Sequence, residues 1–156
     1  MTTPLPTLND VNGLFTMLFG HDTTCKAGKA PLPPDACAIV ALYNDKDGAT
    51  KRLLTCDLAF ANSAGAALSM IPPGAAADAT KAGNVPDNIL ANLHEVMNIA
   101  VNLFTDTFDG RLELASVSRV SELSPETKAA LSSKERSTVD VAIPRYVAGR
   151  VGLIAV

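Results

Sequence analysis

The hydrophobic positions near the start of the chain recur every three or four residues, at Leu8, Val11, Leu14, Phe15, Leu18 and Phe19. That spacing predicts a helix over about residues 8–19. Thr7 and Asp10 match the capping box that often precedes a helix, and Gly20 follows the last periodic position. Residues 20–36 contain several glycine and proline residues, so we expect a connecting loop without regular structure there.

The next segments change from strand-like to helix-like patterns. Residues 37–43 and 51–55 are short β-capable runs, and Asp47-Gly48 between them supplies the turn of a hairpin. Asp57 is suited to cap a helix from residue 58 to about 71, which is rich in Ala, Gly and Ser. Such small side chains let a neighbouring element approach closely. The Ala-rich stretch that follows, up to Gly83, reads as a linker or a frayed extra turn.

The most periodic segment of the chain begins at residue 84 or 86 and continues to about residue 104. Its apolar residues keep to one stripe: Ile89, Leu93, Val96, Met97, Ala100 and Phe104. Beyond it, residues 111–120, 138–143 and 151–156 have strand patterns, and a short helix is predicted from about residue 125 to 131. Pro144 indicates that the second of these strands ends there or lies at a sheet edge.

This order of elements lacks the alternation of strand and helix that a doubly wound sheet requires. We therefore expect an α+β fold, with helices packed on an antiparallel or mixed β-sheet. With 156 residues, of which 47% are hydrophobic, the chain can bury a substantial core, and we expect one domain over residues 1–156. No internal repeat is evident in the sequence.

Charge and hydropathy exclude several classes of function. The formal net charge is -3 and no block of basic residues is present, so a nucleic-acid partner is not expected. The longest apolar stretch, residues 64–77, is interrupted by Ser69 and Pro72-Pro73, which argues against a membrane-spanning helix. The first residues also lack the basic region of a secretory signal, so we expect a cytoplasmic protein.

The cysteines do not form a recognisable metal or disulfide pattern. Cys25, Cys37 and Cys56 are an odd set without a Cys-x-x-Cys pair, which favours reduced thiols. His21 with Cys25 and Cys37 has the spacing of no standard zinc site. We therefore expect no metal ion and no cofactor bound by this chain.

The polar face of the long helix offers the most informative chemistry. At about 100° per residue, the side opposite the apolar stripe carries Asp87, Ala91, Glu95, Asn98 and Asn102. Asn is a poor helix former, and four of them cost about 2 kcal/mol relative to Ala if all are interior to the helix: Asn88, Asn92, Asn98 and Asn102. Two interpretations remain: this face is simply solvated, or a function has retained these side chains.

The sequence Glu95-Val-Met-Asn98 resembles the helical Glu-x-x-Asn signature of the CheC/CheX/FliY-type chemotaxis phosphatases. The hairpin around Asp47-Gly48, the Ala-rich helix ending near Pro72-Pro73 and the later strands are also similar to that family's order of elements. A single motif is typical of the CheX-like branch. Ala91, His94 and Ser121 depart from the pattern, since the family usually has Asp or Ser, Gly and Pro at these positions.

The resemblance implies a CheX-like fold and a protein that docks on a phosphorylated response-regulator receiver domain and hydrolyses its aspartyl phosphate. Asn98 would position the attacking water, and Glu95 would pair with a Lys of the receiver, which also supplies the magnesium ion. Asp87, Ala91 and Asn102 would share the docking face. The alternative is a non-catalytic signalling adaptor or assembly component with the same fold.

The resemblance also implies a homodimer. The closing strand, residues 151–156, is apolar on both sides and would leave an edge prone to aggregation if it were bare. We therefore expect this strand either to be covered within the chain or to pair in a dimer.

Overall fold

The computed structural model describes residues 4–156, and within this range six strands form one antiparallel sheet in the order β1-β5-β6-β3-β2-β4. The strands are β1 (Thr24–Ala27), β2 (Ile39–Asn44), β3 (Thr50–Cys56), β4 (Glu113–Arg119), β5 (Arg136–Ala142) and β6 (Gly149–Ala155). The predicted α+β class is confirmed. The predicted hairpin is β2–β3, in which the side chain of Asp45 accepts from the backbone of Asp47 and Ala49 within the turn.

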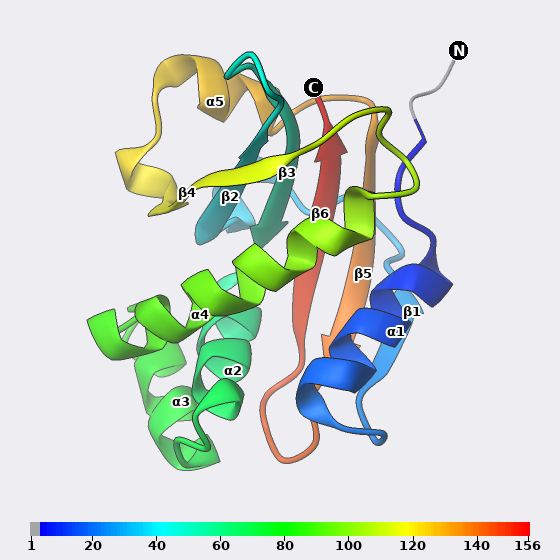
Figure 1. Cartoon of the computed structure of the whole chain (residues 1–156). Helices are drawn as coiled ribbons and strands as arrows, with labels where there is room; N and C mark the ends of the chain where they lie inside the picture. Colours follow the sequence, from blue (N-terminus) through cyan, green and yellow to red (C-terminus); the bar gives the residue numbers. More distant parts are fainter. Residues whose placement is uncertain (1–3) are drawn as a thin grey trace.

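Most of the helical structure covers one face of this sheet (Figure 1). It comprises α1 (Leu8–Phe19), α2 (Leu58–Leu68), α3 (Pro73–Lys81) and α4 (Asp87–Ile99), which continues as the 3-10 helix η2 (Ala100–Phe104). The predicted caps are present: Thr7 and Asp10 form a capping box on α1, and the Asp57 side chain accepts from Phe60 N at the start of α2. The short helix α5 (Pro125–Ala130) and two single 3-10 turns, η1 (Pro34–Ala36) and η3 (Val120–Glu122), complete the elements.

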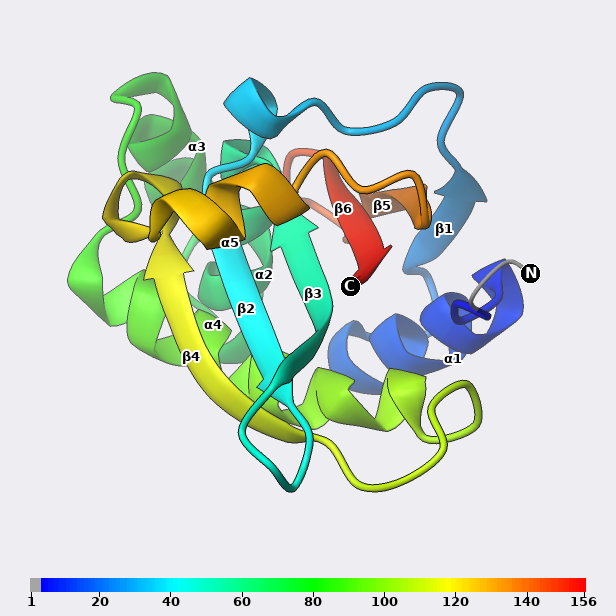
Figure 2. The same ribbon diagram turned by 90° about the horizontal axis from the view of Figure 1, so that it is seen from above.

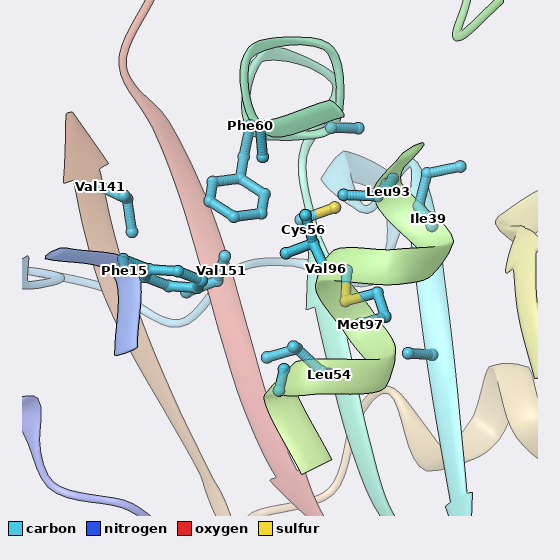
Figure 3. Packing of buried hydrophobic residues seen from close by; sticks show 14 of the residues in the cluster. Phe15, Ile39, Leu54, Cys56, Phe60, Leu93, Val96, Met97, Val141 and Val151 are labelled. Atoms are coloured by element: carbon cyan, nitrogen blue, oxygen red, sulfur yellow. The ribbon is translucent and has the colours of Figure 1, made fainter. Parts of the chain in front are cut away.

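The main core lies between this helical layer and the sheet (Figure 3). Leu93, Val96 and Met97 of α4 are fully buried and point toward sheet residues that include Leu54 and Cys56. Burial of each large aliphatic side chain contributes about 1.5–3 kcal/mol. The predicted apolar stripe, from Ile89 to Phe104, is buried throughout, and this fixes how α4 is rotated about its axis.

The small residues of α2 allow α4 to approach closely, as the sequence predicts. A Cβ atom added to Gly65 would lie only 2.5 Å from the carbonyl oxygen of Ile89. At the same contact, the side-chain amide of Asn92 donates a 2.9 Å hydrogen bond to the carbonyl oxygen of Gly65. Gly65 therefore permits the close approach of α2 and α4, and Asn92 stabilises it.

The opposite face of the sheet is covered by α5 and by the segment around residues 28–36 (Figure 2). Val40, Leu53 and Ile154 pack there with Leu131. The backbone N–H of Leu32 donates to Thr138 Oγ1 at 3.0 Å, which ties the segment down over the sheet. The structure thus has a helical layer on one side and a thinner cover on the other.

Four sequence predictions need correction. Residues 20–36 are not only a loop, because they contain β1, which pairs with the distant strand β5. The Ala-rich stretch before Gly83 is the helix α3, which starts at Pro73 and benefits from the high helix propensity of alanine. The helix predicted from residue 58 to about 71 ends at Leu68, and the long helix becomes a 3-10 helix at Ala100.

The closing strand β6 lies inside the sheet, between β5 and β3. Of the two expectations for this strand, coverage within the chain is therefore confirmed. Both edges of β6 pair with strands of the same chain, so β6 needs no second copy of the protein to cover it.

The strand order contains an internal symmetry that the sequence does not reveal. Exchanging β1 with β4, β2 with β5 and β3 with β6 turns the order β1-β5-β6-β3-β2-β4 into its own reverse. Each half begins with a helix, α1 before β1 and α4 before β4. The sheet is thus built from two helix-plus-three-strand units, and α1 is the counterpart of α4.

Candidate functional site

The polar face of α4 is a solvent-exposed surface, as predicted. Pro86 precedes the helix and Asp87 places a negative charge in its first turn, where the helix dipole favours one. Because the apolar stripe is buried, the opposite side faces solvent, and the five residues that the sequence places there are all exposed: Asp87, Ala91, Glu95, Asn98 and Asn102. We call these five residues the α4 face.

The side chains of Glu95 and Asn98 have no hydrogen bond or ion pair with any other residue in the part of the chain that the structure describes. Residues three apart on a helix have neighbouring side chains, about 5–6 Å between their Cβ atoms. Asn92, by contrast, is explained by its bond to Gly65. Packing therefore accounts for Asn92 but leaves Glu95 and Asn98 without a role inside the fold.

A buried tyrosine anchors the C-terminal part of α4. The hydroxyl of Tyr43 donates to the carbonyl oxygen of Met97, and its ring packs 5.3 Å from that of Phe104. Burial raises the pKa of Tyr43 above its ordinary value, so the hydroxyl remains a donor at any physiological pH. The backbone on either side of Asn98 is thereby held to the sheet.

At the other end of the face, Asp87 is held in an ion pair. Arg119, from β4, donates to Asp87 Oδ1 at 3.2 Å and to the carbonyl oxygen of Val85 at 2.8 Å. An exposed pair of this kind contributes little stability but orients the carboxylate. Arg119 was missed by sequence reasoning, because no motif connects a strand residue to a helix start 32 positions earlier.

Residues of the α4 face line several hollows. The first, of about 400 Å³, lies between α4 and β4 and is lined by Asp87, Leu90, Ala91, His94 and Val117. Another, of about 310 Å³, lies between α1 and η2 and is lined in part by Gly13, Met17 and Asn102. Ala91, where the resembled family has Asp or Ser, lines the first hollow.

The counterpart helix α1 does not repeat the motif. Its buried residues Val11, Leu14 and Phe15 have the same spacing as Leu93, Val96 and Met97 of α4. With these positions matched, Gly13 and Thr16 fall where α4 has Glu95 and Asn98. The Glu-x-x-Asn pair therefore belongs to one half of the sheet, as the single motif predicts.

The three cysteines are free thiols, as expected. Burial raises the pKa of Cys25 to about 11, and it also raises the pKa values of Cys37 and Cys56. Between residues 4 and 156, no group of three His, Cys, Asp or Glu side chains is arranged to hold a metal ion. Over the same residues, no helix has both the length and the apolar character needed to cross a membrane.

Comparison with known proteins identifies the fold. No protein-family model and no curated protein sequence matches the chain. Among solved structures it is similar to a chain of the CheX-CheY-BeF3-Mg²⁺ complex from Borrelia burgdorferi, with a TM-score of 0.56, 11% identity, and coverage of 94% of this chain and 93% of that one. It is also similar to a chain of the FliM-SpeE complex from H. pylori, with a TM-score of 0.55, 8% identity, and coverage of 95% and 80%. The chain therefore has a CheX-like α+β fold.

Proposed function

We propose that this protein docks through the α4 face on a phosphorylated receiver domain and hydrolyses its aspartyl phosphate. The observation that carries the proposal is the state of Glu95 and Asn98, which are exposed and unengaged on a helix that is otherwise tightly packed. The fold supports it as well, since one similar structure is a complex of CheX with CheY.

In the proposed step, a water molecule attacks the phosphorus atom opposite the acyl oxygen of the partner's aspartate. The bond between phosphorus and that oxygen breaks, which releases inorganic phosphate and restores the carboxylate. The Asn98 carboxamide has both a donor and an acceptor, so it can align the water without acting as a strong base. The partner supplies the magnesium ion and the Lys that neutralise the charge.

Glu95 would act in docking. Its carboxylate lies one helical turn before Asn98 and has no cation to pair with among residues 4–156. An ion pair with a Lys of the receiver would orient α4 so that Asn98 enters the partner's site. The hollow beside Ala91 lies next to this contact and would receive a side chain of the same partner.

A second function, a non-catalytic adaptor or assembly component, is favoured by one observation. Ala91 stands where the resembled family carries Asp or Ser, so one polar group of the usual face is missing. An adaptor would use the same docking face without changing the phosphate. One assay distinguishes the phosphatase from the adaptor. Catalytic amounts of the protein are added to a labelled phosphorylated receiver domain that is known to bind it. A phosphatase shortens the lifetime of the aspartyl phosphate, whereas an adaptor leaves it unchanged.

The homodimer implied by the resemblance also stays a proposal. The closing strand β6 is internal to the sheet, so it offers no free edge for a dimer contact. Sedimentation velocity at tens of micromolar, a range where weak association shows, distinguishes a dimer from a monomer.

A further inference from the structure

The strand β1 forms an open edge of the sheet, at the side away from β4 (Figure 2). In an antiparallel ladder, alternate residues direct their backbone N–H and C=O groups toward the neighbouring strand. Gly28 N donates to Thr138 O at 2.8 Å, and Lys26 lies opposite Asp140 in the register. By this alternation, the backbone groups of Cys25 and Ala27 point away from β5 and are available to another strand.

A groove of about 430 Å³ runs beside this edge, between β1 and α1. The helix contributes Leu8, Asn9 and Asn12 to one wall, and residues 23–26 form the other. An extended peptide placed against β1 would therefore contact a helix on one side and a free strand edge on the other. This is the geometry of β-augmentation, in which the main chain provides the pairing and the groove provides specificity.

One polar group in the groove is buried without a partner. Thr23 is only 4% exposed, and its Oγ1 atom makes no hydrogen bond within residues 4–156. A hydroxyl in that state is costly unless something satisfies it. Because Thr23 lines the groove, a carbonyl or carboxylate oxygen of a bound segment is a suitable acceptor.

The charge of the groove indicates what kind of segment fits. Among the described residues that line it, Lys26 carries the one formal charge, and it has no ion pair. The acid opposite it in the register, Asp140, is instead 3.5 Å from Arg150 Nε. A second copy of β1 paired in a register centred on Lys26 would bring two Lys26 side chains together, whereas a partner segment with a carboxylate at this position would match its charge.

We propose that β1 and α1 bind an extended, acidic peptide segment of a partner protein as an added strand. Its backbone would pair with Cys25 and Ala27, a carboxylate would pair with Lys26, and an oxygen atom would accept from Thr23. The groove lies at the opposite edge of the sheet from β4, the strand beside α4. This interaction is therefore independent of the proposed phosphatase and can be tested without a receiver domain.

The test uses the whole ¹⁵N-labelled protein and a seven-residue acetylated peptide that alternates Val with Thr and Glu. We expect saturable chemical-shift changes at residues 23–27 and in the first half of α1. Amide exchange at Cys25 and Ala27 should slow by about tenfold or more as these N–H groups become paired. Two matched peptides are controls, one with Lys in place of Glu and one with alternate backbone nitrogens methylated, and both should bind at least about tenfold more weakly.

Protein variants separate binding from folding. Lys26→Glu should reverse the preference between the Glu and Lys peptides, whereas Lys29→Glu, at an exposed residue outside the groove lining, should leave it unchanged. Thr23→Val should weaken peptide binding while preserving or raising thermal stability, since it removes a buried unpaired hydroxyl. The proposal is overturned if millimolar peptide causes no saturable chemical-shift changes, or if the changes are confined to α4. It is also overturned if the methylated peptide binds as tightly as the unmethylated one. Protection of the Cys25 and Ala27 amides that rises with protein concentration in the absence of peptide would mean that β1 pairs with a second copy, and would overturn it as well.

Discussion

The hydroxyl of Tyr43 donates a 2.6 Å hydrogen bond to the backbone carbonyl oxygen of Met97, the residue immediately before Asn98. Tyr43 belongs to β2 and is fully buried, so the contact fixes α4 directly to the sheet. Three residues after Met97 the α-helix changes to the 3-10 helix η2. The position of Asn98 is therefore set by the core.

We expect Tyr43→Phe to lower the free energy of unfolding by about 1–3 kcal/mol, because a buried carbonyl loses its donor. It should also slow phosphate release, because Asn98 is then held less firmly. Urea unfolding and the receiver assay measure the two effects. Tyr146→Phe is the matched control: it removes a hydroxyl that donates to the carbonyl oxygen of Ile71, which is not part of α4, and should change stability alone.

The contact between α2 and α4 gives a second prediction. Gly65→Ala should lower the free energy of unfolding by about 2 kcal/mol or more, because its Cβ would meet the backbone oxygen of Ile89 at 2.5 Å. Gly74→Ala in α3, where a Cβ meets nothing within 4 Å, should be neutral or stabilising by up to about 1 kcal/mol. Equal losses for both variants in urea unfolding would show that the close approach of the helices is not the cause.

The thiols give a prediction about pH. Since the pKa of Cys25 is raised from 9.0 to about 11, the fraction of reactive thiolate at pH 8 falls about 10²-fold. Cys37 and Cys56 are buried and also have raised pKa values. We expect slow reaction of the native protein with Ellman's reagent at pH 8 and fast reaction in urea. A native thiol that reacts as fast as an unfolded one would contradict this.

Periodicity predicted the parts of the fold in which one face of an element is buried. The apolar stripe from Ile89 to Phe104 predicted both the long helix and which side of it faces the core, because apolar side chains are most stable out of water. The four-residue strand β1 was missed, since its pairing with β5 depends on residues far away in the chain. The helix α3 was missed because Pro72-Pro73 favours a break, although a proline in the first turn also suits a helix start.

The exposure of the candidate site was predictable to the same extent. The α4 face followed from helix geometry alone, and the structure places all five of its residues in solvent. Two features of the site depend on contacts between segments that are distant in the sequence. The pairing of Asp87 with Arg119 joins elements that only the sheet brings together, and the bond from Asn92 to Gly65 separates a structural asparagine from the unengaged Asn98.

Docking and chemistry should depend on different residues of the α4 face. Glu95→Gln removes the charge from an exposed, unengaged side chain, so the fold should be unchanged. Binding to a receiver should weaken by about tenfold, because one partner of an interfacial ion pair is lost. Glu126→Gln on α5, also exposed, is the control and should leave the affinity unchanged in the same titration. Equal affinity of the Glu95→Gln variant and wild type would remove Glu95 from the docking surface.

The most direct test of the central claim is the decay of phosphate from a labelled receiver domain that is known to bind this protein, with wild type, Asn98→Ala and Asn88→Ala added in catalytic amounts. Asn88 is exposed on the same helix but lies outside the α4 face. We predict that wild type and Asn88→Ala accelerate decay, and that Asn98→Ala, although folded and still bound, is slower by about 10²-fold or more because the water loses its alignment. Decay that is equal with and without the wild-type protein would contradict the phosphatase and leave the adaptor.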